Sequence, residues 1–203
     1  MRPAILDLME VKYGFKVFDD GHDYDLNIIG IRNPNPSTPV DKFDDQLVIC
    51  YQADGEWHEE KFRCTTDPSL HWLLHPGRVR GTAILKHPQQ VRGGWKIRKH
   101  RGSYLALCQK LPCVVWRDAD KDAEHDHNVD EQTGIWGINI HRASRWRDSA
   151  GPDGEGSIGR YSAGCTVVSD PQAFARVMWL AHKQIELHPT WKTFTYTLLC
   201  EDY

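Results

Sequence analysis

The stretch LVICYQADGEWHEEKFRCT, residues 47–65, contains the clearest local structural signal in the chain. Its central dipeptide, Asp54-Gly55, is typical of a two-residue hairpin turn, because both residue types tolerate a positive φ. The apolar run before this dipeptide and the alternating run after it predict strands over residues 47–51 and 57–65. We therefore expect an antiparallel hairpin and a fold built around a β-sheet.

Short apolar or alternating runs recur along the chain between Gly-, Pro- and Asp-containing segments. They predict further strands over residues 26–31, 82–85, 95–100, 104–109, 113–116, 135–141, 166–168 and 191–199. Arg101-Gly102 indicates a second hairpin turn. Three segments rich in proline or in charged and small polar residues predict loops, at residues 33–39, 118–131 and 144–160.

One long helix is predicted directly after the strand at residues 166–168. Asp170 can cap it, Pro171 suits its first turn, and His188-Pro189 ends it. Apolar residues recur on one face at Phe174, Val177, Met178, Ala181 and Ile185. Residues 5–13 predict a second, short helix. The fold class expected is mainly β, a mixed sandwich or barrel-like domain, with one helix after the strand that follows Cys165.

Composition sets limits on the class of protein. The 203 residues suit a single domain, 1–203, with residues 1–20 as a short N-terminal extension. A net charge of -3 argues against nucleic acid as a partner, because binding phosphates needs a basic face. No apolar run is long enough to span a bilayer, so we expect no membrane span. The first residues lack the apolar core of a signal peptide, so we expect the protein to be made in a cytoplasm.

Six cysteines are present, and none is spaced as Cys-x-x-Cys. Five of them lie in apolar or alternating runs and are interpreted as small core residues: Cys50, Cys64, Cys108, Cys113 and Cys200. Cys165 differs, because it follows Ser162-Ala163-Gly164 between a polar loop and a short β-branched strand. A glycine there allows close approach of the backbone to a substrate, and nearby N–H groups could bind an oxyanion.

A cysteine nucleophile needs a base, because a free thiol is only a few per cent thiolate at neutral pH. His141 is the best candidate, because it ends the predicted strand at residues 135–141 and lies 24 residues (165 − 141) before Cys165. The alternatives are a buried structural thiol for Cys165 and a hydrogen-bonded core histidine for His141.

These two segments resemble the catalytic region of the L,D-transpeptidase family. That family has a strand ending in histidine, a variable loop, and then Ser-His-Gly-Cys leading into a short strand and a helix. Residues 137–144, GINIHRAS, resemble the first part, and residues 162–165, SAGC, resemble the second. The likeness covers roughly residues 134–181. Ala163 stands where the family has a second histidine, and the loop between His141 and Ser162 is longer than is usual in the family.

The resemblance implies that Cys165 is the nucleophile and His141 its base. It implies that Ser162 supports the loop or the histidine, and that N–H groups at Gly164 and Cys165 form the oxyanion hole. Beside these catalytic residues we expect substrate-binding residues in the polar loop, with Trp146 touching the substrate and the arginines holding its carboxylates. The candidate substrate-binding residues are Arg142, Trp146, Arg160 and Tyr161.

The resemblance implies a covalent mechanism on peptidoglycan stem peptides. The thiolate attacks the carbonyl of an L-centre, the D-residue leaves, and the thioester passes to water or to an amine. Neither a metal nor a cofactor is needed. Because this substrate lies outside the cytoplasm, a phage lysin, a virion-carried enzyme or a secreted effector would reconcile it with synthesis in the cytoplasm.

Two other functions stay open on the sequence. A β-rich phage structural or wall-binding protein could have kept this scaffold without catalysis, and Ala163 leaves that alternative in place. A zinc peptidase could use His125 and His127 in the segment Glu124-His125-Asp126-His127. The acidic surroundings of that segment favour a solvated loop instead.

Overall fold

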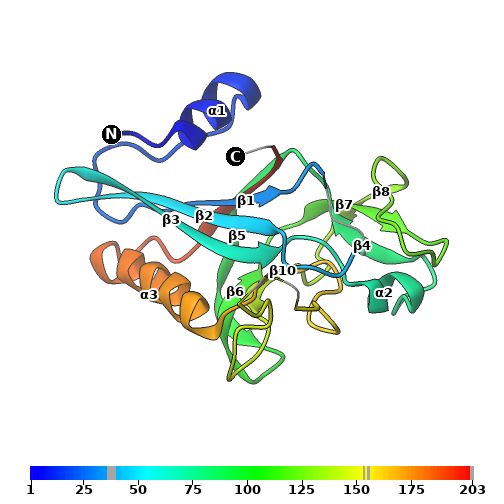
Figure 1. Cartoon of the computed structure of the whole chain (residues 1–203). Coiled ribbons are helices and arrows are strands. Elements are labelled where there is room, and N and C mark those ends of the chain that lie inside the picture. The colour runs from blue at the N-terminus through cyan, green and yellow to red at the C-terminus, as the bar shows by residue number, and fades with distance from the viewer. Residues whose placement is uncertain (36–39, 153, 155, 202–203) are drawn as a thin grey trace.

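A computed structural model describes residues 1–35, 40–152, 154 and 156–201. Eight of its strands form a closed barrel, and three more form a small second sheet beside it (Figure 1). In order around the barrel these are β1 (Asn27–Arg32), β11 (Phe194–Cys200), β5 (Gln89–His100), β6 (Tyr104–Gln109), β9 (Ile140–Arg142), β10 (Thr166–Val168), β3 (Glu56–Thr65) and β2 (Asp45–Ala53). The second sheet is β4 (Thr82–Leu85), β7 (Cys113–Asp118) and β8 (Glu131–Gly134).

Local sequence signals account for most of these elements, and the mainly β fold class is confirmed. The β2–β3 hairpin turns at Asp54 and Gly55, both with positive φ, and the β5–β6 hairpin turns at Arg101 and Gly102 in the same way. The strands at β4, β6 and β10 have the bounds predicted for them. Part of the loop predicted at residues 33–39 lies outside the described residues.

Three helices accompany the strands in the described residues: α1 (Ala4–Tyr13), α2 (Leu70–Leu74) and α3 (Pro171–Leu187). Asp170 caps α3 by accepting hydrogen bonds from the N–H groups of Gln172 and Ala173, as its position predicted. The short α2 was not expected, because five residues carry no helical periodicity. None of these helices is both long and apolar enough to cross a membrane.

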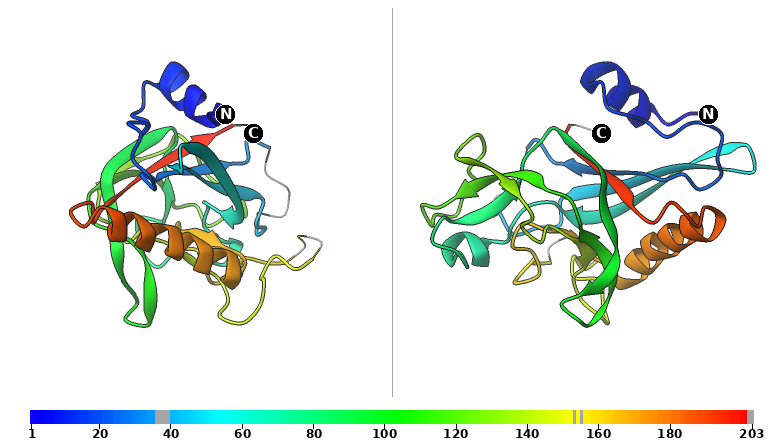
Figure 2. Two further views of the ribbon diagram at one scale, coloured as in Figure 1. Left: turned by 90° about the vertical axis from the view of Figure 1, so that its left-hand side faces the viewer. Right: turned by 180° about the vertical axis from the view of Figure 1, so that it is seen from behind.

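The main core fills the barrel and includes residues from one face of α3. This helix lies against the barrel (Figures 1 and 2). Trp95 and Tyr196, which are almost fully buried, pack edge to face inside the core. A second cluster lies outside the barrel, where Ile5, Leu6 and Met9 of α1 pack on β1 and β2. The first part of the predicted extension at residues 1–20 is therefore packed against the barrel.

The strand predicted at residues 135–141 is wrong for most of its length. Only β9 is regular there, and residues 135–139 are irregular. Gly137 has a φ of +80°, which interrupts extended geometry. The side-chain oxygen of Gln109 accepts hydrogen bonds from the N–H groups of Trp136, Gly137 and Ile138, at 2.9–3.0 Å. These bonds replace strand pairing, and they present the Gly137 carbonyl to the Cys165 thiol.

Candidate active site

The barrel places Cys165 and His141 on neighbouring strands. β9 and β10 run parallel, with His141 in register with Val167, and the Thr166 N–H donates to the Asn139 carbonyl. Cys165 therefore lies at the start of β10, next to the segment that leads into β9. A separation of 24 residues in sequence becomes one pair of adjacent strands.

The loop that carries Cys165 is held from both sides. Gly164 has a φ of +106°, and a Cβ atom there would lie 2.1 Å from the Ala83 carbonyl oxygen on β4. Only glycine allows this approach. Ser162 is fully buried, and its Oγ lies 2.7 Å from the Asp67 carbonyl and 2.8 Å from the Cys165 carbonyl while accepting from the Gly164 N–H. Ser162 thus supports the loop rather than the histidine.

The Cys165 sulfur sits between two backbone groups. The Asn139 N–H donates to Sγ at 3.4 Å, and Sγ lies 3.4 Å from the Gly137 carbonyl. The residue is partly exposed, with the rest of its surface buried against neighbouring groups. Burial raises the pKa of the Cys165 thiol to about 11, although the Asn139 N–H opposes that shift. The resting thiol is therefore neutral at pH 7.

His141 is 4% exposed and oriented by its surroundings. Its Nδ1 lies 2.8 Å from the Arg142 carbonyl, which can only accept, so Nδ1 carries the proton and Nε2 carries the lone pair. The Tyr104 hydroxyl lies 3.3 Å from Nδ1 and 3.2 Å from the same carbonyl. The His100 ring stacks on His141 with centroids 4.2 Å apart. Burial, followed by His100, lowers the pKa of His141 to about 3.

The site at rest thus holds a neutral thiol and a neutral imidazole. Within the described part of the chain, no hydrogen bond joins Cys165 to His141. The Cys165 N–H also donates to no acceptor among those residues, whereas the Gly164 N–H is used by Ser162. Of the N–H groups expected around Gly164 and Cys165, the one at Cys165 is therefore the free backbone donor beside the sulfur.

The predicted substrate-binding residues do not converge on the thiol. Arg142 stacks on the Tyr104 ring at 4.1 Å and donates to the Ser144 carbonyl, so it buttresses the histidine side of the site. Trp146 is 81% exposed, with the Arg145 guanidinium over its ring. Arg160 and Tyr161 are exposed. The contacts of the described residues do not link Trp146, Arg160 or Tyr161 to Cys165 or His141.

Three residues of the site carried no local sequence signal. Tyr104 and His100 flank the β5–β6 hairpin, and they reach His141 only because β6 pairs with β9. Gln109 shapes the segment before Asn139 through its side chain. Polar residues are common at strand ends, so no pattern in the sequence selects these three. Each reaches the site because strands from distant parts of the chain pair with one another.

The two histidines of the zinc alternative lie near one another, with ring centroids 6.4 Å apart, but each is also engaged elsewhere. His125 Nε2 lies 2.8 Å from the Pro68 carbonyl, and His127 packs beside Trp116. Among the described residues, the one group of three or more possible metal ligands within reach of each other is acidic and contains neither histidine: Asp118, Asp120 and Asp126. The arrangement does not favour a zinc peptidase.

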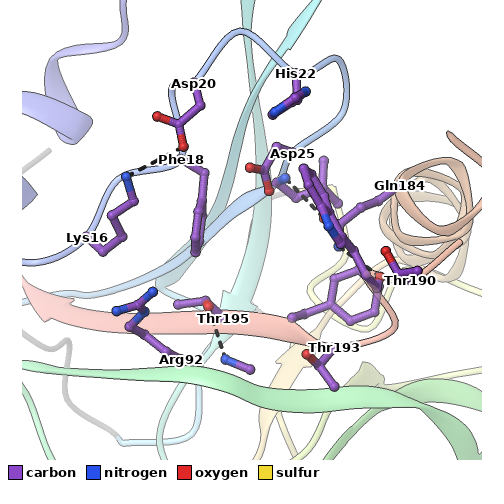
Figure 3. A pocket seen from close by; sticks show the side chains of 14 residues that line it. Lys16, Phe18, Asp20, His22, Asp25, Arg92, Gln184, Thr190, Thr193 and Thr195 are labelled. Atoms are coloured by element: carbon purple, nitrogen blue, oxygen red, sulfur yellow. Dashed lines mark hydrogen bonds and ion pairs between the residues drawn. The ribbon is translucent and has the colours of Figure 1, made fainter. Parts of the chain in front are cut away.

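A cavity of about 470 Å³ lies between the N-terminal segment, the end of α3 and β11 (Figure 3). Phe18, Asp25 and Thr195 are among its lining residues. Its lining includes no residue of the segments that carry Cys165 and His141, so it lies apart from the candidate active site.

Comparison with known proteins adds no family: no family model matches the chain, no curated protein matches it, and no solved structure matches its fold.

Proposed function

We propose that the protein is a cysteine-dependent acyl-transfer enzyme that acts on peptidoglycan stem peptides at an L,D bond. The observation that supports acyl transfer is the His141 tautomer, and the choice of peptidoglycan follows the resemblance of residues 137–144 and 162–165 to the L,D-transpeptidase family. The Arg142 carbonyl holds the proton on Nδ1, which leaves the basic Nε2 on the strand beside Cys165. A nucleophile, a base in a defined tautomer and a free backbone N–H beside the sulfur are the parts that acyl transfer needs.

In the proposed reaction, Cys165 attacks the carbonyl of the L-residue while its proton passes to His141 Nε2. Proton loss accompanies attack, because the thiol pKa is high and the histidine pKa is low in the resting site. The Cys165 N–H stabilises the oxyanion. His141 then protonates the leaving amine of the D-residue, and a thioester remains. Water gives hydrolysis, and an incoming amine gives transpeptidation.

The direct test is digestion of purified tetrapeptide and cross-linked muropeptides, followed by mass spectrometry. We expect the wild-type protein to remove a terminal D-residue or to open a cross-link, and Cys165→Ala to do neither. Cys200→Ala is the matched control, because Cys200 is a partly exposed thiol on β11. Exchange of an added D-amino acid into the product would assign transpeptidation.

The same assay separates the alternatives. Activity that survives Cys165→Ala but disappears with a chelator would replace the proposal with a metallopeptidase. Absence of turnover across several wall types, together with retention of the protein on intact sacculi, would favour a wall-binding role. The cavity in Figure 3 would then be the first place to test for binding.

A further inference from the structure

A second cavity, of about 190 Å³, adjoins the loop that carries the nucleophile. It is bounded by α2, by the turn that follows α2, and by β4 and β7. Ala163, which is exposed, and Trp136 also line it. Trp136 precedes Gly137, whose carbonyl contacts the Cys165 sulfur, and Ala163 is two residues before Cys165. The cavity therefore adjoins two segments that carry or contact Cys165, although Cys165 itself is not among its lining residues.

The charged residues that line this cavity are all basic. Arg78 and Arg117 contribute to its wall, and the lining contains no aspartate or glutamate. Neither of them, nor the neighbouring Arg80, makes an ion pair with a carboxylate in the described part of the chain. Burial is the first cause that lowers the pKa of Arg117, and repulsion from Arg78 and Arg80 is the next. The three arginines therefore carry more positive charge than Asp130, the acid that acts on Arg117, can offset.

Arg117 is held in place by groups other than an acid. It is 6% exposed, and its guanidinium stacks on the Trp136 ring at 4.3 Å. Its Nε donates to the Gln132 side chain at 3.1 Å. The carboxylate of Asp130, which also acts on Arg117, accepts a hydrogen bond from Gln132 instead of from the arginine. A fixed guanidinium with unused donors suits a carboxylate, which it can bind through two parallel hydrogen bonds.

We propose that this cavity is a subsite for a free carboxylate of the acyl-donor peptide, bound by Arg78 and Arg117 while the scissile carbonyl lies at Cys165. This assignment rests on the proposed function, because it deepens the same active site. It differs from the sequence-based expectation, which placed carboxylate binding on arginines of the loop at residues 144–160. The small side chain of Ala163 keeps the cavity open towards the nucleophile.

The test measures binding instead of turnover. Calorimetry with the Cys165→Ala protein would compare four forms of one synthetic tetrapeptide: both carboxylates free, the C-terminal carboxylate amidated, the D-Glu carboxylate amidated, and both amidated. We expect the fully free peptide to bind at least about tenfold more tightly than the doubly amidated one, because amidation removes the charge-assisted hydrogen bonds to the two arginines. The two singly amidated peptides would show which carboxylate enters the cavity.

Variants assign the effect to the cavity. Arg78→Gln and Arg117→Gln should each remove most of the preference for the free peptide, and Ala163→Leu should weaken binding by filling the cavity. Arg92→Gln is the matched control, because it removes the same charge from an exposed position on β5 that lines the cavity of Figure 3, apart from the proposed subsite. Arg117 is buried, so thermal unfolding would verify that its variant folds. Arg78 is exposed, so Arg78→Gln alone would test the proposal if Arg117→Gln does not fold.

The outcomes separate this proposal from the proposed function. Equal binding of free and doubly amidated peptides would overturn the carboxylate subsite, whether or not the wild-type protein digests muropeptides. A preference that Arg92→Gln removes as strongly as Arg78→Gln would assign the effect to general charge attraction or to the cavity of Figure 3, which Arg92 lines, and would overturn the subsite as well. A preference lost in Arg78→Gln and kept in Arg92→Gln would establish the subsite even if Cys165 proved catalytically inert.

Discussion

At the scale of single residues, the candidate site depends on two groups whose charged forms are disfavoured. Burial raises the pKa of Cys165 to about 11 and lowers that of His141 to about 3. The resting protein therefore holds both groups neutral. A thiolate and an imidazolium would therefore form only when Cys165 attacks a bound carbonyl. The neutral state of the resting thiol can be tested without substrate.

Alkylation of Cys165 by iodoacetamide should be slow at pH 7. Because only the thiolate reacts, and its fraction below the pKa rises about tenfold per pH unit, the rate should keep rising from pH 7 to about pH 10. Mass spectrometry of the Cys165 peptide at each pH measures this rate. A rate that already levels off near pH 7 would show a preformed thiolate–imidazolium pair instead.

His141 should also make stability fall in acid. Its pKa is about 6.5 in the unfolded chain and about 3 in the folded protein, so between these values the unfolded state binds the extra proton. The contribution is present above pH 6.5 and is lost as the pH falls to 3, by at most about 1.4 kcal/mol per pH unit. His87 and His127 act in the same direction.

The difference between wild-type and His141→Gln isolates the contribution of this histidine. Urea unfolding at pH 7, 6, 5 and 4 should show a weaker loss of stability in the variant. Identical pH slopes in the two proteins would mean that His141 is solvated in the folded state.

At the scale of elements, the nucleophile loop is locked to β4 by Gly164. Gly164→Ala would combine a positive φ with a Cβ atom 2.1 Å from the Ala83 carbonyl, so either β4 or the loop must move. We expect a loss of at least about 2 kcal/mol in the free energy of unfolding, and altered reactivity of Cys165.

Gly159→Ala is the matched control for this prediction. Gly159 lies in the preceding loop with a φ of +61°, and a Cβ atom there meets nothing within 4 Å. This variant should cost only about 1 kcal/mol, from backbone strain alone. Equal effects of the two substitutions in urea unfolding would count against a steric lock at β4.

The N-terminal cap of α3 by Asp170 is a second local feature that should stabilise the fold. Asp170→Ala should lower the free energy of unfolding by about 1 kcal/mol, because the N–H groups of Gln172 and Ala173 would lose their acceptor. Glu186→Ala, near the exposed end of the same helix, should change the free energy of unfolding by only a few tenths of a kcal/mol. Chemical denaturation of both variants measures the difference. Equal losses in the free energy of unfolding would show that the Asp170 cap does not stabilise the protein.

At the scale of the whole molecule, Arg32 links the barrel to the second sheet and to the nucleophile loop. It is 1% exposed, pairs with Asp67 at 2.7 Å, and donates to the Leu85 carbonyl on β4 at 3.0 Å. The Asp67 carbonyl in turn accepts from the Ser162 hydroxyl. A chain of buried polar contacts therefore joins β1 to the residues around Cys165.

Replacing Arg32 with methionine should destabilise the protein by about 3–5 kcal/mol, because it leaves Asp67 buried without its cation. It should also change the rate of Cys165 alkylation. Arg92→Met, at an exposed position, should leave both quantities nearly unchanged. Thermal unfolding and the alkylation assay report the two effects, and a near-neutral Arg32→Met would show that Asp67 is neutral in the folded protein.

The sequence by itself determined the elements whose signals are local. The Asp54-Gly55 and Arg101-Gly102 turns, the alternating strands and the capped α3 each depend on residues a few positions apart, so propensity and periodicity suffice to find them. The same is true of the Cys165 segment, because its glycine and short strand are adjacent. His141 was proposed as the partner from its place at the end of a predicted strand and from the family resemblance, and the structure adds the placement of the two residues on neighbouring strands.

Only the tertiary structure decided what surrounds these two residues. Gln109 interrupts the strand predicted at residues 135–141, Tyr104 and His100 enclose His141, and Arg117 faces a cavity beside Ala163. Each of these contacts joins residues that the chain separates by more than twenty positions. The contacts of Gln109, Tyr104 and His100 arise because barrel closure sets β6, β9 and β10 side by side, and that of Arg117 arises because the second sheet packs beside the barrel. A pattern of neighbouring residues does not encode which distant strands will pair.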